Sequence, residues 1–77
     1  MVFIVFMTVN EQIEKGNYHS ITIINEKFTL ILRPPRKALK KNPKATITKM
    51  PEWCEDIGWY PVKATELKEE GEIIIYV

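Results

Sequence analysis

Two apolar segments joined by three polar residues constrain the fold of this chain most. Residues 21–24 (Ile-Thr-Ile-Ile) and 28–32 (Phe-Thr-Leu-Ile-Leu) are rich in β-branched and aromatic side chains, and residues 25–27 (Asn-Glu-Lys) connect them. Such side chains fit the pleated surface of a strand, and a polar connection of this length is common in hairpins. The sequence therefore predicts an antiparallel β-hairpin over residues 20–33.

Other segments also have strand-like composition, and polar or proline-containing stretches separate them. They are residues 1–9, which are almost wholly apolar, residues 45–50, which alternate polar and apolar, and residues 58–65 and 72–77. The first run has the continuous apolar character of a strand that is buried on both faces. A polar turn over residues 66–71 is expected to join the last two strands.

Helical signals are short. Asn10 can cap a helical turn that stops at Gly16, and Pro35 can begin a second short helix that ends near Asn42. The predicted fold class is mainly β: a small antiparallel sheet or barrel of five to six strands, SH3-like or OB-like in architecture, with at most one or two short helical turns. Residues 1–77 are expected to form a single domain, because a chain this short builds one core.

The single cysteine and single histidine limit how the domain can be stabilised. Cys54 and His19 exclude an internal disulfide and a cysteine-based zinc site, which leaves packing or a homodimer. The apolar run at residues 1–9 lacks the positive region and cleavage site of a signal peptide. It is also shorter than the roughly 20 residues of a membrane span. We therefore expect a cytoplasmic protein with no membrane partner, where the lone thiol stays reduced.

Basic residues are concentrated in residues 33–44, which contain six cationic side chains and no acidic one. Residues 1–50 hold nine Lys or Arg and three Glu, a balance of +6, whereas residues 51–77 hold two Lys and seven acids, a balance of −5. Such asymmetry points to nucleic acid, an anionic surface or an oppositely charged partner. The alternative is that the acidic half folds against the basic half and neutralises it.

The basic segment is predicted to be a stiffened, exposed loop. Pro34 and Pro35 restrict the chain, and the short helix after them is expected to turn Ala38 and Leu39 toward the core. The cations then share a surface that can neutralise phosphates without reading bases. We therefore predict a small non-enzymatic protein that binds nucleic acid with low specificity. The predicted contact residues are Arg33, Arg36, Lys37, Lys40, Lys41 and Lys44.

Three aromatic residues, Trp53, Trp59 and Tyr60, lie close together in the acidic half. Exposed aromatic side chains can contact bases or proteins, but the acids interleaved with these three repel phosphate. The alternative function is therefore a protein-interaction or inhibitor module, of the kind that viruses and mobile elements encode, acting through opposed charges and this segment. A purely structural interpretation makes Trp53 and Trp59 a lid over one end of a small barrel.

An enzymatic function has little support in the sequence. His19 and Cys54 are too isolated to indicate a catalytic dyad, the three glycines form no phosphate-binding loop, and no metal or cofactor is expected. The one enzymatic alternative is a metal-independent ribonuclease, in which cations and a proton-transfer group act on RNA. Its candidate residues are His19, Arg33, Arg36 and Tyr60.

Overall fold

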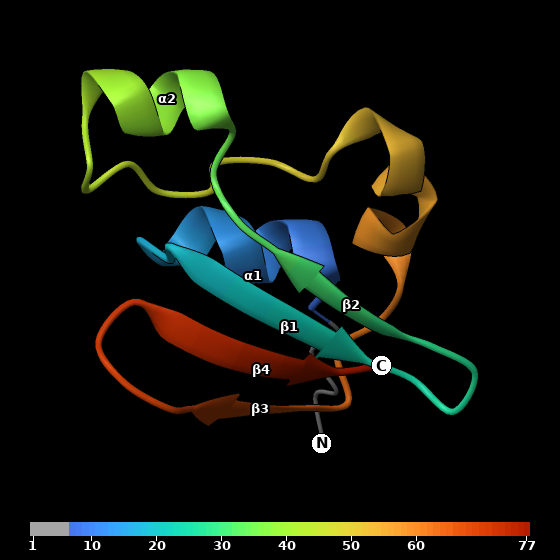
Figure 1. The fold of residues 1–77 in the computed structure, drawn as a ribbon. Helices are drawn as coiled ribbons and strands as arrows, with labels where there is room; N and C mark the ends of the chain where they lie inside the picture. The colour runs from blue at the N-terminus through green and yellow to red at the C-terminus, as the bar shows by residue number, and fades with distance from the viewer. Residues whose placement is uncertain (1–6) are drawn as a thin grey trace.

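A four-stranded sheet and three short helices make up the fold in the computed structural model, which describes residues 7–77. Figure 1 shows the helices and the sheet in their layers. The elements in chain order are α1 (Val9–Lys15), β1 (Ser20–Ile24), β2 (Thr29–Leu32), α2 (Arg36–Lys41), the 3-10 helix η1 (Glu52–Trp59), β3 (Ala64–Leu67) and β4 (Glu72–Tyr76).

The strands form one open sheet in the order β2-β1-β4-β3. The predicted hairpin is confirmed, because β1 and β2 are antiparallel with Ile21 opposite Leu32 and Ile24 opposite Thr29. β3 and β4 form a second antiparallel hairpin. The two hairpins meet through β1 and β4, which run parallel to each other at the centre of the sheet. A parallel pair needs a long crossover, and here that crossover contains β2, α2, η1 and β3.

The fold is α/β in character rather than mainly β. An antiparallel sheet or barrel of five to six strands is not found in the described residues, which form four strands in an open, mixed sheet. Residues 45–50 form no strand: their one bridge pairs Tyr18 with Ile47. The strand expected over residues 58–65 begins only at Ala64, because η1 extends to Trp59.

Helix α1 begins where the sequence suggested a strand. The side chain of Thr8 accepts the N–H of Glu11 at 3.3 Å, and the Glu11 carboxylate accepts the N–H of Thr8 at 3.2 Å. This reciprocal capping box satisfies two free donors and starts the helix at Val9, although Val favours strands. The expected strand over residues 1–9 is therefore wrong at Val9, and its residues 1–6 lie outside the described part of the chain.

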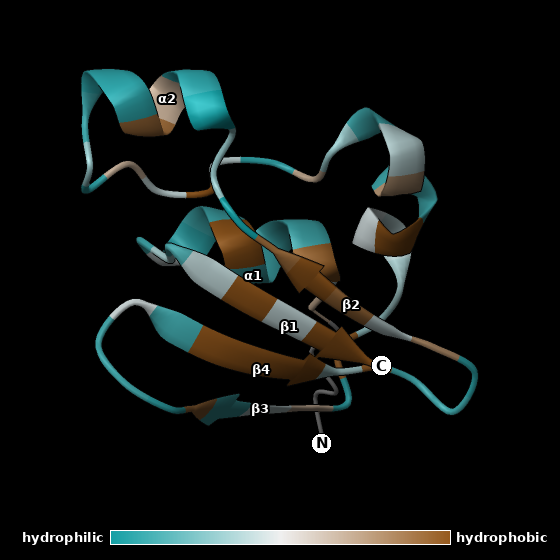
Figure 2. Cartoon of the chain, viewed as in Figure 1, coloured by the Kyte–Doolittle hydropathy of each residue, from teal (hydrophilic) through white to brown (hydrophobic). Residues whose placement is uncertain are grey.

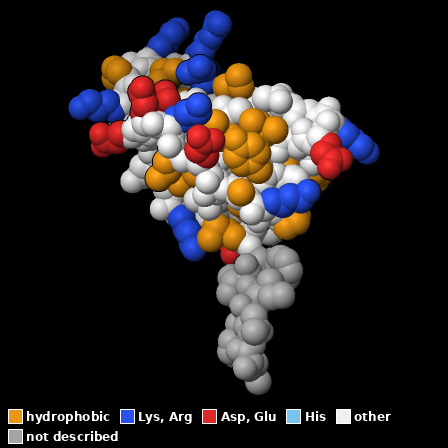
Figure 3. All heavy atoms as spheres, turned by 90° about the horizontal axis from the view of Figure 1, so that it is seen from below, with side chains coloured by type: hydrophobic (Ala, Val, Ile, Leu, Met, Phe, Trp, Pro, Cys, Tyr) orange, Lys and Arg blue, Asp and Glu red, His pale blue; other side chains and the backbone are white. Residues whose placement is uncertain are grey.

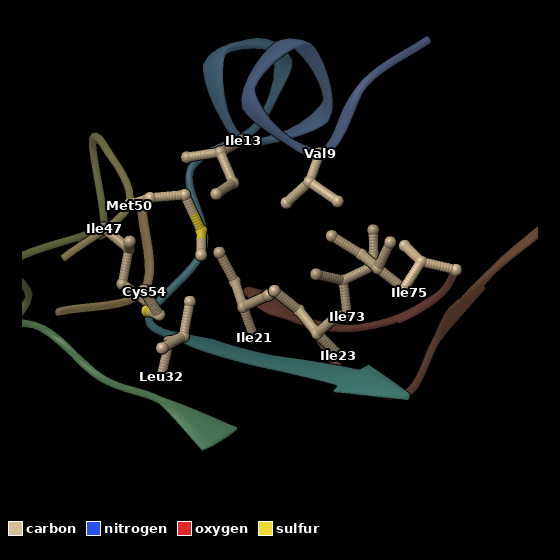
Figure 4. Packing of buried hydrophobic residues seen from close by; sticks show 11 residues of the cluster. Val9, Ile13, Ile21, Ile23, Leu32, Ile47, Met50, Cys54, Ile73 and Ile75 are labelled. Atoms are coloured by element: carbon tan, nitrogen blue, oxygen red, sulfur yellow. The ribbon is translucent and has the colours of Figure 1, made fainter. Parts of the chain in front are cut away.

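The core lies between α1 and one face of the sheet, as Figure 4 shows. Every second side chain of β1 and β4 points toward α1 and is buried. These side chains are Ile21 and Ile23 on β1 and Ile73 and Ile75 on β4. In Figure 2 these strands carry the hydrophobic colours together with the inner side of α1. The other sheet face has no described helix over it, so its side chains are half-buried on β1 and β4, and Ile31 on β2 is 60% exposed. The core residues are Val9, Ile13, Ile21, Ile23, Leu32, Ile47, Met50, Cys54, Ile73, Ile75 and Val77.

The exterior mixes both signs of charge. On the face shown in Figure 3, cationic and acidic side chains lie interspersed around a group of hydrophobic ones. The asymmetry between the two halves of the sequence therefore does not make this face uniformly charged. Within residues 7–77, the helices are all too short and polar to cross a bilayer.

Candidate functional site

The basic segment, residues 33–44, leaves the sheet at the end of β2 and carries α2. Pro35 occupies the N-cap position with φ −58° and ψ 147°, and the C-cap residue Asn42 donates its N–H to the Ala38 carbonyl at 2.9 Å. The Asn42 side chain then accepts the N–H of Lys44 at 3.0 Å, which turns the chain back. A helix thus forms within the predicted span, between Pro35 and Pro43.

This segment is attached to the domain by few apolar contacts. Pro34 is buried, but α2 has no buried residue, and Ala38 and Leu39 are half-buried. The prediction that these two side chains face the core is therefore met only in part, because neither is fully buried. In Figure 1, α2 lies apart from the layer formed by α1 and the sheet. Its cationic residues consequently project from a helix that contributes little to the core.

All of the predicted cationic contact residues are exposed. The side-chain hydrogen bonds of residues 7–77 involve none of their charged groups. These groups can therefore meet a ligand without first breaking such a bond. The residues are Arg33, Arg36, Lys37, Lys40, Lys41 and Lys44.

The two ends of the basic segment meet at a pocket of about 590 Å³. Arg33 comes from the end of β2 and Lys44 from the turn after α2. The remaining walls come from the chain between α1 and β1, from α2 itself and from the turn between β3 and β4. The lining residues are Asn17, His19, Arg33, Pro34, Leu39, Pro43, Lys44, Thr46, Glu70 and Gly71.

The site thus has two parts with different geometry. Arg33 and Lys44 line the pocket, whereas the other four cations belong to α2 and are not part of its lining. Sequence reasoning identified the cations but missed Asn17, Thr46 and the pocket itself. No local pattern could have shown the pocket, because five separate segments of the chain build it.

One acidic residue of the C-terminal half reaches this site. Glu70 lines the pocket, and the turn that carries it is held in place by the N–H of His19, which donates to the Gly71 carbonyl at 2.8 Å. A ring nitrogen of His19, Nε2, lies 3.1 Å from the Glu70 carbonyl oxygen. The acidic half therefore meets the basic segment at the pocket, but α2 has no acidic residue of its own.

The aromatic candidates lie on η1 and its C-cap, and two of them are strongly exposed. Trp53 and Trp59 are 72% and 71% exposed, so the lid over a barrel is wrong. The backbone of η1 kinks at Cys54, where φ is −138° and ψ is 25°, so η1 is two short helical pieces. Cys54 is buried and Ile57 is half-buried, whereas both Trp side chains lie outside. Tyr60 is 40% exposed and packs edge-on against Phe28, with ring centroids 6.2 Å apart.

Only two of the four ribonuclease candidate residues lie at the same pocket. His19 and Arg33 line the same pocket, but Arg36 and Tyr60 are not among its lining residues. Cys54 is buried in the core, and this burial raises the pKa of its thiol, which favours the neutral form over the nucleophilic thiolate. Within the described residues, no cluster of three or more His, Cys, Asp or Glu side chains could hold a metal ion.

Comparisons with protein-family models, with curated proteins and with solved structures find no significant match to this chain. The geometry and chemistry of the site are therefore the basis for inferring the function.

Proposed function

We propose that this chain binds nucleic acid with low sequence specificity through the basic segment. The observation that carries the proposal is the exposure of all six cations of residues 33–44, four of which lie on α2, a helix with no buried residue. Lysine and arginine side chains in such a setting contact phosphates, which are common to every sequence. The free thiol of Cys54 is compatible with a reducing compartment, and we propose that this activity takes place in the cytoplasm.

The proposal has a quantitative consequence in salt. Each phosphate contact releases condensed counterions, so affinity falls as salt rises. If the cations of α2 make about four contacts, the logarithm of the affinity falls with the logarithm of salt at a slope of about −3 to −4. If the protein instead bound nucleic acid through base contacts alone, the affinity would depend much less on salt.

The test measures oligonucleotide binding by fluorescence anisotropy from about 50 to about 200 mM salt. The site variant changes the four α2 cations, Arg36, Lys37, Lys40 and Lys41, to Gln, which keeps the helix propensity. The matched control changes four exposed lysines elsewhere to Gln, so both proteins lose the same charge. These lysines are Lys15, Lys27, Lys63 and Lys68.

We expect the site variant to lose most of the affinity and to flatten the salt slope, whereas the control changes both only slightly. If the natural chain shows no binding at low salt, the function is wrong. If both variants bind equally well, binding occurs but the site is wrong.

A second candidate function is protein interaction through η1, including self-association as a homodimer. The specific observation is the exposure of both Trp53 and Trp59, because aromatic residues of this size anchor many protein interfaces. Light scattering of the natural chain and of the variant with both tryptophans changed to Ala tests self-association at two ionic strengths. An apolar dimer persists in high salt and is lost in the variant. A monomer under every condition contradicts the homodimer.

A further inference from the structure

The walls of the pocket are divided by chemistry. Arg33 and Lys44 supply positive charge from the two ends of the basic segment. Three apolar side chains come from Pro34, Leu39 and Pro43. The remaining polar side chains, His19, Asn17, Thr46 and Glu70, can donate or accept hydrogen bonds. A ligand that contacts all three kinds of lining residue must combine an anionic group, an apolar surface and hydrogen-bonding groups.

Glu70, an exposed acidic residue of the pocket lining, argues against a small inorganic anion as the ligand. Arg33 offers a planar donor fork and Lys44 a point charge, which both suit phosphate. Glu70 lines the same pocket and repels a second negative charge, but it accepts hydrogen bonds from hydroxyl or amino groups. The preferred ligand therefore has a phosphate at one end and hydrogen-bond donors at a distance from it.

The size of the pocket sets the scale of that ligand. Its volume of about 590 Å³ falls within the range of about 300 to 1,000 Å³ that is usual for small-molecule and cofactor sites. One nucleotide has the required groups: a phosphate, sugar hydroxyls, amino groups on the base and a flat ring that packs against apolar side chains.

We propose that this pocket binds a single nucleotide of the bound strand, with its phosphate at Arg33 and Lys44 and its base against Pro34, Leu39 and Pro43. The donors of the sugar and base then face Glu70. This inference rests on the proposed function, because the cations of α2 lie next to the pocket in the chain and contact the neighbouring phosphates. A base can enter the pocket only when it is unpaired, so single strands bind more tightly than duplexes.

The first experiment measures the binding of a nucleoside monophosphate by calorimetry, with inorganic phosphate and the unphosphorylated nucleoside as comparison ligands. The pocket variant changes Arg33 and Lys44 to Gln. The matched control changes the exposed Lys27 and Lys63 to Gln, which removes the same charge but leaves the basic segment and the pocket lining intact. Circular dichroism confirms that each variant retains the fold of the natural chain.

We expect the natural chain and the control to bind the nucleotide, and the pocket variant to bind it roughly tenfold or more weakly, because two charge-assisted contacts are lost. Inorganic phosphate and the nucleoside each bind more weakly than the nucleotide. If phosphate binds as tightly as the nucleotide, or if the control loses as much affinity as the pocket variant, the nucleotide site is wrong.

A second variant, Glu70→Gln, tests the acidic wall without removing a cation. The substitution removes the charge that repels inorganic phosphate, so inorganic phosphate should bind more tightly. The ratio of nucleotide affinity to phosphate affinity should therefore fall. An unchanged ratio contradicts the role of Glu70.

Oligonucleotide binding separates the failure of this inference from the failure of the proposed function. If an oligonucleotide binds with the expected salt slope but the monophosphate does not bind or compete, the pocket is wrong and the function stands. If neither binds, the function itself is wrong.

Discussion

Gly71 and His19 lie directly against each other at the wall of the pocket. The Gly71 carbonyl accepts the N–H of His19 at 2.8 Å, and a Cβ atom at Gly71 would lie 2.5 Å from Cδ2 of the His19 ring. Gly71 also has a φ of +80°, a conformation that favours glycine. This contact joins the turn before β4 to the start of β1, and so it holds Glu70 at the pocket.

Gly71→Ala is expected to destabilise the domain by roughly 1 to 3 kcal/mol, because the new Cβ is strained at positive φ and displaces the His19 ring. Urea unfolding followed by circular dichroism measures this loss. The pocket also narrows, so the affinity for the nucleotide proposed above is expected to fall in the variant even under conditions where it is fully folded. A stability equal to that of the natural chain would show that the turn has another conformation.

The two faces of the sheet are expected to respond differently to the same small deletion. Ile23→Val removes a methyl group from a fully buried side chain on β1 and should cost about 0.5 to 1.5 kcal/mol. Ile31→Val makes the same change on β2, where the side chain is 60% exposed, and should alter stability by less than about 0.5 kcal/mol. Equal losses in chemical denaturation would indicate that the face bearing Ile31 is also covered.

Tyr76 and Glu66 are expected to make the stability sensitive to alkaline pH. The Tyr76 hydroxyl donates to Glu66 at 3.2 Å, and this bond, with burial and the Glu66 charge, raises the pKa of Tyr76 above its ordinary value. The neutral hydroxyl therefore contributes stability that is complete below the unfolded pKa of Tyr76 and is lost as pH rises through the raised folded pKa.

Glu66→Gln should lower the pKa of Tyr76 toward its ordinary value, because the negative charge that opposes ionisation is gone. Ultraviolet absorbance titration follows tyrosinate formation, with the Tyr76→Phe variant used to assign the signal. Glu69→Gln serves as the control, since Glu69 is not among the groups that shift Tyr76. A titration curve that Glu66→Gln leaves unchanged would contradict the hydrogen bond.

Trp53 and Trp59 are expected to contribute little to stability despite their size. Each side chain is more than 70% exposed, so its replacement by Ala should change the free energy of unfolding by less than about 0.5 kcal/mol. Both should be quenched by acrylamide nearly as readily in the folded as in the unfolded protein. Tyr60→Ala is the contrasting variant and should cost more, because Tyr60 packs against Phe28. Strong protection from quenching would place a tryptophan in an interface.

Local sequence was sufficient for the hairpin of β1 and β2 and for the helix between Pro35 and Asn42. In both cases the signal lies within a few residues: β-branched runs beside a polar loop, and proline at the start of a helix. It failed at Val9, where capping by Thr8 outweighs the strand preference of the residue itself. The local sequence also misled at residues 45–50, which alternate as a strand does, but which pair within the described part of the chain only through the bridge between Tyr18 and Ile47.

The sequence by itself determined which residues bear charge and that six of the cations are concentrated in residues 33–44. Only the tertiary structure decided what those charges face. The parallel pairing of β1 with β4 brings the turn at Gly71 beside His19, and this places Glu70 at a pocket whose other walls include Arg33 and Lys44. That pairing joins segments about fifty residues apart and depends on apolar burial over the whole sheet, which no local pattern specifies.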